Sequence, residues 1–273
     1  MSDLAKTQLP LTNALILERQ GSVLKIWFNR PEAKNALNAE MTDELVNVLS
    51  LVKDDRSIRT IVLRGKGGFF CAGGDIKGFR SDMQTVDVAE VAKGNRSFGD
   101  VMIMLNEQPQ VVIILVEGAA IGGGLGLACV ADVTLVTADA RFRLSETSLG
   151  IPPAQIAPFV TERVGLTQAR RLMLTGARFK GEDAVKLGIA HGVADNVEDL
   201  EAQCDATLKQ INACAPEANA VTKGILFETL RRPRADALDF ASRGFAQCML
   251  SPEGLEGVAA FAEKRRAYWN EEA

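Results

Sequence analysis

The apolar positions divide the chain into a first part rich in strands and a second part rich in helices. The continuous apolar run Val111–Val116 is typical of a strand that is buried on both faces, and Arg59–Leu63 has the same character. Alternating positions over Ala14–Glu18 and Val23–Phe28 predict a hairpin whose turn contains Gly21. Shorter strands are predicted at Val133–Val136 and Arg141–Leu144.

Helical spacing first appears between the predicted hairpin and the first buried strand. Met41, Leu45, Val48 and Leu49 recur at helical intervals and predict an amphipathic helix over Ala39–Val52. A second helix is predicted near Phe98–Leu105. The polar segment Ser81–Arg96 before it has no clear pattern, and its place beside a glycine-rich loop suggests a lid or a segment that shapes the substrate site.

From Ala154 onward the apolar spacing is helical. Proline near the first position and glycine after the last position mark several of the expected helices. The predicted helices are Ala154–Val164, Thr167–Thr175, Gly181–Leu187, Val197–Cys214, Pro216–Leu230, Arg234–Met249 and Pro252–Tyr268. Strand–loop–helix units followed by a helical tail indicate an α/β fold.

Two glycine-rich stretches each follow a predicted strand. The first contains Gly73 and Gly74, with Asp75 placed to cap a helix, and alone it is typical of an ordinary turn. The second contains glycines at 122, 123 and 124, where a helix should begin. Glycine costs a helix about 1 kcal/mol relative to alanine, so this run implies either close packing or backbone N–H groups aimed at a ligand. Two such loops meeting at one oxygen would form an oxyanion hole.

Composition narrows the class of protein. The 273 residues have a formal net charge of −4 and a pI near 5.3, so no basic surface favours nucleic acid or an anionic membrane. Five cysteines, an odd number without a CxxC pair, indicate reduced thiols and no zinc site. The N-terminal residues do not resemble a signal peptide, and no apolar run is long enough to span a membrane. We therefore expect a cytoplasmic enzyme that needs no metal.

Several catalytic motifs are absent. The dinucleotide fingerprint GxGxxG fails because Cys129 occupies the place of its third glycine, and there is no P-loop, GxSxG or HExxH. Cys71 lies beside a glycine loop, but the only histidine, His191, is far away in sequence, so a small buried thiol is the favoured interpretation. Among the candidate catalytic residues, Glu146 remains. Its local sequence alone is more typical of a solvated loop carboxylate or a helix N-cap. A glutamate with an oxyanion hole suits proton transfer next to a thioester carbonyl.

Three segments, FFCAGGDIK, GAAIGGGLGLACVADVTLVTADARFRLSE and EGVAAFAEKRRA, together resemble the crotonase, or enoyl-CoA hydratase/isomerase, family. The resemblance spans essentially the whole chain. It implies a spiral core of ββα units over residues 1–204 and a C-terminal helical domain over residues 205–273 that builds a homotrimer or homohexamer. It also implies an acyl-CoA substrate and no separate cofactor.

The resemblance assigns roles to particular positions. It carries the oxyanion hole onto the backbone amides of Gly74 and Gly123 and makes Glu146 the acid/base carboxylate. Phe261 and Lys264 match a tail region that sometimes comes from a neighbouring subunit. The implied substrate and coenzyme A contacts are Arg30, Lys34, Ala36, Ala72, Gly73, Asp75, Ile76, Gly122, Phe261 and Lys264.

One departure from the family pattern concerns the chemistry. Hydratases with two carboxylates carry a second glutamate in GGGxE, where this chain has Gly126, and double-bond isomerisation needs only one base. Against isomerisation, the segments around Leu144–Glu146 and Gly150–Pro158 are similar to the branch acting on 3-methylglutaconyl-CoA and isohexenylglutaconyl-CoA, which also tends to lack this glutamate. We therefore expect a hydratase of leucine or acyclic terpene breakdown.

Two further points stay open in the sequence. The extra carboxylate of a glutaconyl substrate needs a basic or amide partner, for which Lys77, Arg80 and Arg143 are candidates by proximity to the motifs. A catalytically inactive acyl-CoA-binding scaffold and an RNA-binding role are non-enzyme alternatives. The acidic pI and the presence of Glu146 argue against both.

Overall fold

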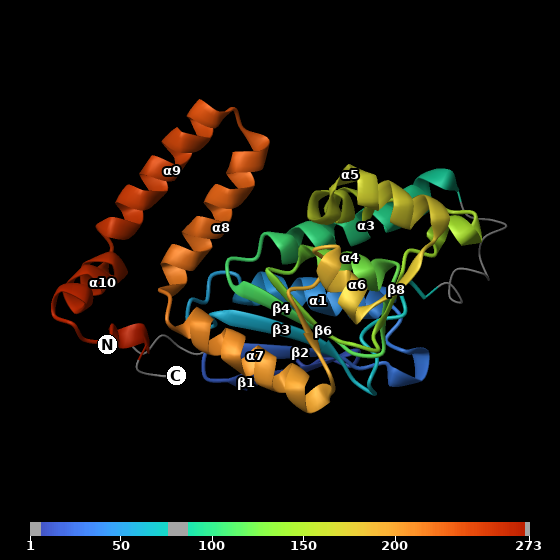
Figure 1. Ribbon diagram of the computed structural model, residues 1–273, viewed down its shortest axis with the longest axis horizontal. Coiled ribbons are helices and arrows are strands. Elements are labelled where there is room, and N and C mark those ends of the chain that lie inside the picture. The colour runs from blue at the N-terminus through green and yellow to red at the C-terminus, as the bar shows by residue number, and fades with distance from the viewer. Residues whose placement is uncertain (1–6, 76–86, 271–273) are drawn as a thin grey trace.

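The computed structural model describes residues 7–75 and 87–270, and its centre is a six-stranded sheet (Figure 1). The strand order is β1-β2-β3-β4-β6-β9; β1 and β2 are antiparallel, and every other neighbouring pair is parallel. The strands are β1 Leu15–Gln20, β2 Val23–Phe28, β3 Thr60–Gly65, β4 Val111–Val116, β6 Val133–Thr137 and β9 Gly192–Ala194. The predicted α/β class is confirmed.

Both faces of the large sheet are covered, which explains the uninterrupted apolar runs. In β4, Val112 and Ile114 enter the main core, whereas Ile113 and Leu115 enter a second, smaller core on the opposite face. The smaller core is closed by α7, Val197–Asn212, which contributes Leu200, Cys204 and Ile211. A strand between two cores has no polar face, so its sequence shows no alternation.

A second sheet contains three short strands in the order β5-β7-β8. These strands are β5 Ala119–Ile121, β7 Arg141–Arg143 and β8 Arg178–Lys180. The chain passes from β4 to β5 and then to α4, and from β6 to β7 and then to α5. The ββα unit implied by the family resemblance is therefore present twice in succession.

The helices follow the hydrophobic pattern closely in most places. Asn38 caps the first helix by accepting a hydrogen bond from the N–H of Met41, at 3.0 Å. The remaining helices of the described chain are α1 Ala39–Val52, α3 Val88–Asn106, α4 Gly123–Val130, α5 Ala157–Thr175, α6 Gly181–Lys186, α8 Pro216–Arg231, α9 Arg234–Met249 and α10 Pro252–Ala262, with short 3-10 turns at Pro31–Ala33, Glu146–Leu149 and Tyr268–Asn270. Within the described residues, no helix is both long and apolar enough to cross a membrane.

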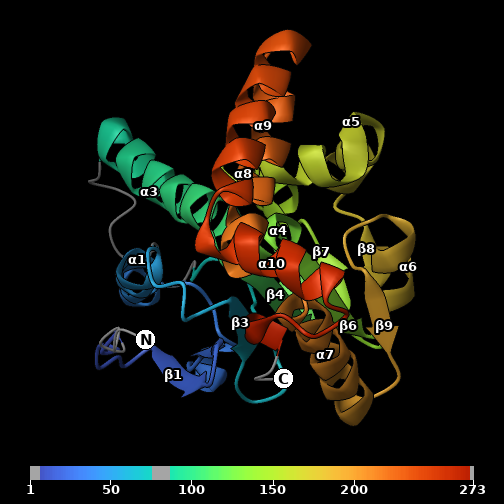
Figure 2. The same cartoon turned by 90° about the vertical axis from the view of Figure 1, so that its left-hand side faces the viewer.

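Helices α8, α9 and α10 form an arm that projects from the sheet (Figures 1 and 2). Nζ of Lys223, in α8, donates to the carbonyls of Gln108 and Gln110, both at 2.7 Å, and pairs with Asp132. Arg59, next to β3, donates to the carbonyl of Trp269 at 2.8 Å, in the turn that follows α10. The arm is thus fastened to the body through its first helix, α8, and through the residues that follow its last helix, α10. The predicted boundary between residues 204 and 205 lies inside α7, and this division of the chain stays a prediction.

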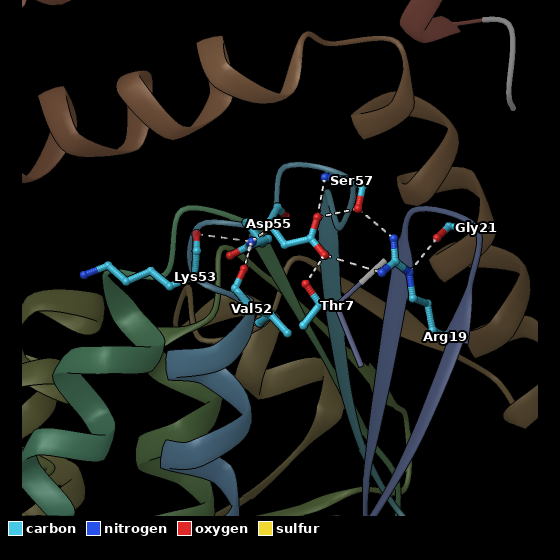
Figure 3. A network of polar contacts seen from close by, with 8 residues as sticks. Thr7, Arg19, Gly21, Val52, Lys53, Asp55 and Ser57 are labelled. Atoms are coloured by element: carbon cyan, nitrogen blue, oxygen red, sulfur yellow. Dashed lines mark hydrogen bonds and ion pairs between the residues drawn. The ribbon is translucent and has the colours of Figure 1, made fainter. Parts of the chain in front are cut away.

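Asp55 ties the start of the described chain to the sheet (Figure 3). Its carboxylate accepts hydrogen bonds from the hydroxyl of Thr7 at 2.6 Å and the N–H of Ser57 at 2.9 Å, and it pairs with Arg19 at 3.4 Å. The hairpin, the loop after α1 and residue 7 are therefore held at one point.

The structure corrects the start of one predicted helix. Helix α3 begins at Val88, ten residues before the predicted start at Phe98; its polar first half is helical although it has no buried face. The segment Ser81–Arg96 is therefore partly helix, and its residues 81–86 lie outside the described chain. The two helices predicted over 154–175 lie on either side of Gly165, whose φ of 74° and ψ of 157° are not helical and divide α5 into two helical parts.

The helical tail also differs from its prediction. It contains β8 and β9, and the first half of the chain contains β5; three-residue strands are too short to show a period, and their neighbours define them. Helix α10 ends at Ala262 rather than continuing to Tyr268. Lys264 has a φ of 54°, a left-handed conformation that a helix does not continue through.

Candidate active site

The two glycine-rich loops lie side by side because a short parallel bridge pairs the chain at Cys71 with Ala120. The N–H of Cys71 donates to the carbonyl of Ala119 and the N–H of Ile121 donates to the carbonyl of Cys71, both at 3.0 Å. A Cβ added at Gly73 would lie 3.0 Å from the carbonyl oxygen of Ile121. The two loops therefore adjoin, and the convergence of their N–H groups on one oxygen stays a prediction.

The amides assigned to the oxyanion hole have no acceptor within the described chain. Gly74 is bridged to Leu37 on one side, but its own N–H donates no hydrogen bond to a residue in 7–75 or 87–270. The same holds for the N–H of Gly123, the first residue of α4. A Cβ added at Gly74 would meet open space, whereas one at Gly123 would lie 3.1 Å from Leu37 and 3.3 Å from Phe98. Apolar side chains thus lie beside Gly123.

Glu146 begins the 3-10 turn that follows β7. The N–H of Gly122 donates to the carbonyl of Arg143 at 2.9 Å, which joins the start of α4 to the end of β7. The guanidinium of Arg143 donates to the carbonyl of Gly176 and to the hydroxyl of Ser148. These contacts hold the turn between α4 and the end of α5, so Glu146 is fixed beside the second glycine loop.

The carboxylate of Glu146 packs directly against Gly122. A Cβ at Gly122 would lie 2.7 Å from Oε1, so the missing side chain makes room for the acid. Oε2 is buried and has no hydrogen-bond partner within the described residues. Burial raises the pKa of Glu146, against an opposing effect of nearby backbone N–H groups. A buried carboxylate with an unused oxygen is suited to accept a proton.

The place of a second carboxylate is filled. A Cβ at Gly126 would collide with Cγ2 of Ile156, would lie 2.8 Å from Cβ of Ile156 and would lie 3.3 Å from Cε of Met102. Ile156 and Met102 are both buried. Packing therefore excludes any side chain at this position, and an apolar surface replaces the acid found in GGGxE.

The loop from Arg30 to Ala36 is joined to the first glycine loop. Arg30 pairs with Asp75 at 2.9 Å and also donates to the carbonyl of Ala36. The N–H of Ala72 donates to the carbonyl of Lys34 at 3.0 Å, and the amino group of Lys34 lies over the ring of Phe69. The structure thus brings together the predicted coenzyme-binding residues up to Asp75.

Other predicted site residues lie elsewhere. Phe261 is 88% exposed in α10 and Lys264 follows it, and Figure 1 places α10 on the opposite side of the molecule from α3 and α5. Ile76, Lys77 and Arg80 lie outside the described residues. Arg143, a candidate partner for a substrate carboxylate, holds the turn of Glu146 through its hydrogen bonds to Gly176 and Ser148, and a contact with substrate stays a prediction.

The thiol of Cys71 and the imidazole of His191 have surroundings that are typical of structural groups rather than catalytic ones. Burial raises the pKa of Cys71 to about 12, and its sulfur accepts the N–H of Gly73 at 3.4 Å, so the inert interpretation of this thiol is supported. Nδ1 of His191 accepts the N–H of Thr134 at 3.0 Å, in β6. Within residues 7–75 and 87–270, no three histidine, cysteine, aspartate or glutamate side chains are grouped to hold a metal ion.

Sequence reasoning missed the residues that shape the site from a distance. Asn35 is fully buried with a φ of 54°, and its amide donates to the carbonyls of Lys66 and Phe69 while its oxygen accepts the N–H of Arg30. An asparagine in a turn after proline is a signal that could have identified it. Ile156 and Phe98 gave no such signal.

Comparison with known proteins is consistent with this geometry. The family model described as enoyl-CoA hydratase/isomerase matches residues 18–272. The chain is 30% identical over 260 residues to the short-chain-enoyl-CoA hydratase of Clostridium acetobutylicum, covering 93% of this chain and 96% of that protein. Pseudomonas aeruginosa AtuE superposes with a TM-score of 0.93 at 47% identity, covering 95% and 100% of the two chains. An enoyl-CoA hydratase/isomerase from Marinobacter aquaeolei gives a TM-score of 0.91 at 46% identity, covering 94% and 99%.

Proposed function

The chain belongs to the enoyl-CoA hydratase/isomerase family and is a hydratase-type enzyme, and on this premise we propose that its substrate is a branched glutaconyl-CoA. The two substrates proposed are 3-methylglutaconyl-CoA and isohexenylglutaconyl-CoA, in leucine or acyclic terpene breakdown. The enzyme adds water across the double bond next to the thioester.

One observation supports the reaction above the others. The half-buried Glu146 carboxylate lies against Gly122, and its buried Oε2 has no hydrogen-bond partner among the described residues. Within the same part of the chain, the N–H groups of Gly123, next to Gly122, and of Gly74, in the adjoining loop, donate to no acceptor. A base beside two free donors suits a reaction in which negative charge develops on a carbonyl oxygen while a proton moves nearby.

The proposed hydration uses Glu146 twice. It takes a proton from water as the water oxygen bonds to C3, and the electrons of the double bond move to the thioester oxygen to form an enolate. The N–H groups of Gly74 and Gly123 donate to that oxygen. Glu146 then returns the proton to C2, the carbonyl re-forms, and the net change is the addition of one water.

The substrate class is supported by the apolar packing at Gly126. Ile156 belongs to the segment Gly150–Pro158 that is similar to the glutaconyl branch, and it occupies the space above Gly126. In the proposed complex this apolar region lies nearest the branch at C3 of the substrate.

Isomerisation of the double bond is the second candidate function. The same contact of Ile156 on Gly126 favours it, because a single carboxylate is sufficient to move a proton between C2 and C4 and position 126 supplies no second acid to hold water. The two functions differ in product mass, so one assay separates them.

The test is a turnover assay on 3-methylglutaconyl-CoA, isohexenylglutaconyl-CoA, crotonyl-CoA and a 3-enoyl-CoA, with products identified by mass. A gain of one water on a glutaconyl thioester supports the proposal. A shifted double bond at unchanged mass replaces it with the isomerase. Glu146→Gln is the control, and turnover that survives this change refutes the role of Glu146. An inactive scaffold would bind acyl-CoA without turning over any of the four.

The arm is proposed to assemble the protein into a trimer or a hexamer. Its helices expose large apolar side chains, namely Leu226, Leu230, Leu238, Phe245, Leu255, Val258 and Phe261. Such a surface is typical of a subunit interface. A neighbouring copy would bring Phe261 and Lys264 to a site that these residues do not reach in their own chain. Light scattering measures the mass, and a monomer at micromolar concentration would refute this assembly.

A further inference from the structure

Three polar side chains meet above Gly99, a buried glycine of α3. A Cβ at Gly99 would collide with Oε1 of Gln155 and would lie 3.0 Å from Nη1 of Arg96. Nε2 of Gln155 donates to Oδ1 of Asn95 at 2.9 Å. The missing side chain at Gly99 therefore lets a guanidinium and two amides gather on one face of the helix.

This cluster adjoins the reaction site through its immediate neighbours in the chain. Phe98, which precedes Gly99, would lie 3.3 Å from a Cβ at Gly123, the oxyanion-hole residue. Ile156, which follows Gln155, packs on Gly126. The proposal places the acyl chain from Gly123 past these two apolar side chains, so that its far end reaches the polar cluster.

We propose that Arg96 and Gln155 bind the free carboxylate of the substrate and thereby select glutaconyl thioesters. The inference rests on the proposed function, because only a substrate with an acid at the far end of its acyl chain would use this site. An arginine binds a carboxylate through two parallel N–H groups, and a side-chain amide adds a neutral donor.

The exposed ion pair that Arg96 makes with Asp100 leaves its guanidinium available to a ligand. Nη1 pairs with Asp100 at 2.5 Å, one helical turn further on, and the two side chains are 54% and 61% exposed. Pairs this exposed contribute little to stability and exchange readily. Two other arginines near the glycine loops are engaged instead, Arg30 with Asp75 and Arg143 with the carbonyl of Gly176. Asp100 thus takes the position that the substrate carboxylate would take over.

Binding of unreactive thioesters tests the site without chemistry. Glutaryl-CoA carries the distal acid and butyryl-CoA does not, and calorimetry measures both affinities. Arg96→Gln should weaken glutaryl-CoA binding by about 30-fold to 100-fold and leave butyryl-CoA within about twofold. Arg96→Lys should recover part of this loss, and Gln155→Leu should cost about fivefold for glutaryl-CoA alone.

Two variants of the same helix sharpen the result. Lys93→Gln removes an equal charge from an exposed position and should change neither affinity, which controls for the general field of the helix. Asp100→Asn removes the competing acid and should tighten glutaryl-CoA binding by about twofold to threefold. Equal weakening of both thioesters by Arg96→Gln, or unchanged glutaryl-CoA binding, would overturn the proposal.

Turnover separates this inference from the proposed function. A wild-type enzyme that hydrates crotonyl-CoA but no glutaconyl thioester refutes the proposed substrate and this site with it. A wild-type enzyme that prefers the glutaconyl thioester, with a preference that persists in Arg96→Gln, refutes this site alone. A KM that rises for the glutaconyl thioester with little change in kcat supports it.

Discussion

The two glycine-rich loops look alike in sequence, but their glycines are required for different physical reasons. At Gly122, Gly124 and Gly126 an added Cβ would press on Glu146, Cys71 and Ile156 respectively, so the absence of side chains is a packing requirement. At Gly74 an added Cβ would meet nothing within 4 Å. The second loop is built into the core, and the first loop is open at Gly74.

The difference shows that glycine content alone does not identify a binding loop. In the second loop, close packing and a backbone N–H available to a ligand both explain the glycines. Gly122 makes room for the carboxylate of Glu146, and Gly123 provides an N–H that has no acceptor among the described residues. In the first loop, Gly73 needs its φ of 93°, whereas Gly74 needs neither a special φ nor space. Substitutions test this contrast when they separate the effect of a positive φ, the effect of a contact with the added Cβ and the effect of having no contact.

The largest effect is expected for Gly122→Ala. The methyl group would displace the Glu146 carboxylate, and the φ of 51° is unfavourable for alanine, so kcat should fall by about 10²-fold to 10³-fold. Gly21→Ala is the matched control, because it has a φ of 58° with nothing within 4 Å and lies in the hairpin turn. It should lose about 1 kcal/mol of stability and keep its kcat. An equal loss of kcat in both variants would contradict the assigned contact.

The next effect concerns the filled space at Gly126. Gly126→Ala should lower the free energy of unfolding by about 1–3 kcal/mol through overpacking on Ile156. Combined with Ile156→Ala, the loss should be smaller than the sum of the two separate losses, because the second change relieves the first. Urea denaturation measures all three variants, and strict additivity would show that the two residues do not press on each other.

A moderate effect is expected from pH. Burial raises the pKa of Glu146, and the base is the ionised form, so kcat should fall about tenfold per pH unit below a pKa that lies above that of an exposed glutamate. The same shift makes the ionised acid unfavourable in the folded state. Glu146→Gln should therefore raise Tm at pH 8, and this advantage should fade as the pH falls through the raised pKa. An advantage that grows toward acid would reverse the assigned direction.

The smallest effect is expected for Gly74→Ala. The N–H is kept, no contact is made and φ is not positive, so stability should change by less than about 0.5 kcal/mol. Thermal unfolding in the absence of substrate checks this. A large drop in Tm would mean that the first loop is as tightly packed as the second.

Patterned elements could be predicted from the sequence almost to the residue. The structure has α1 at Ala39–Val52 and β4 at Val111–Val116, as predicted, because each presents a sustained period or a long apolar run. The start of α3 at Val88 could not be predicted, because a helix that is exposed all round has no stripe to reveal it. The break within α5 at Gly165 falls between the two helices predicted there.

The site residues also differ in whether they could be predicted from the sequence. Glu146 and the two loops were identified from motifs, and the structure places them together. The filling of Gly126 by Ile156 joins residues thirty positions apart through a contact with no periodic signal. The cluster above Gly99 likewise joins two separate segments, and only their placement in space reveals it.

The exposed first half of α3 has a consequence for amide hydrogen exchange. From Val88 to Ser97 every residue is exposed, and Figure 2 shows this end of the helix extending from the body. Its backbone N–H groups are protected only by local helical turns, so they exchange through fraying rather than through unfolding of the protein. Arg96 lies where this frayed part meets the packed part. A ligand held there would slow the deuterium uptake of the whole exposed half, which makes the helix a built-in reporter of occupancy.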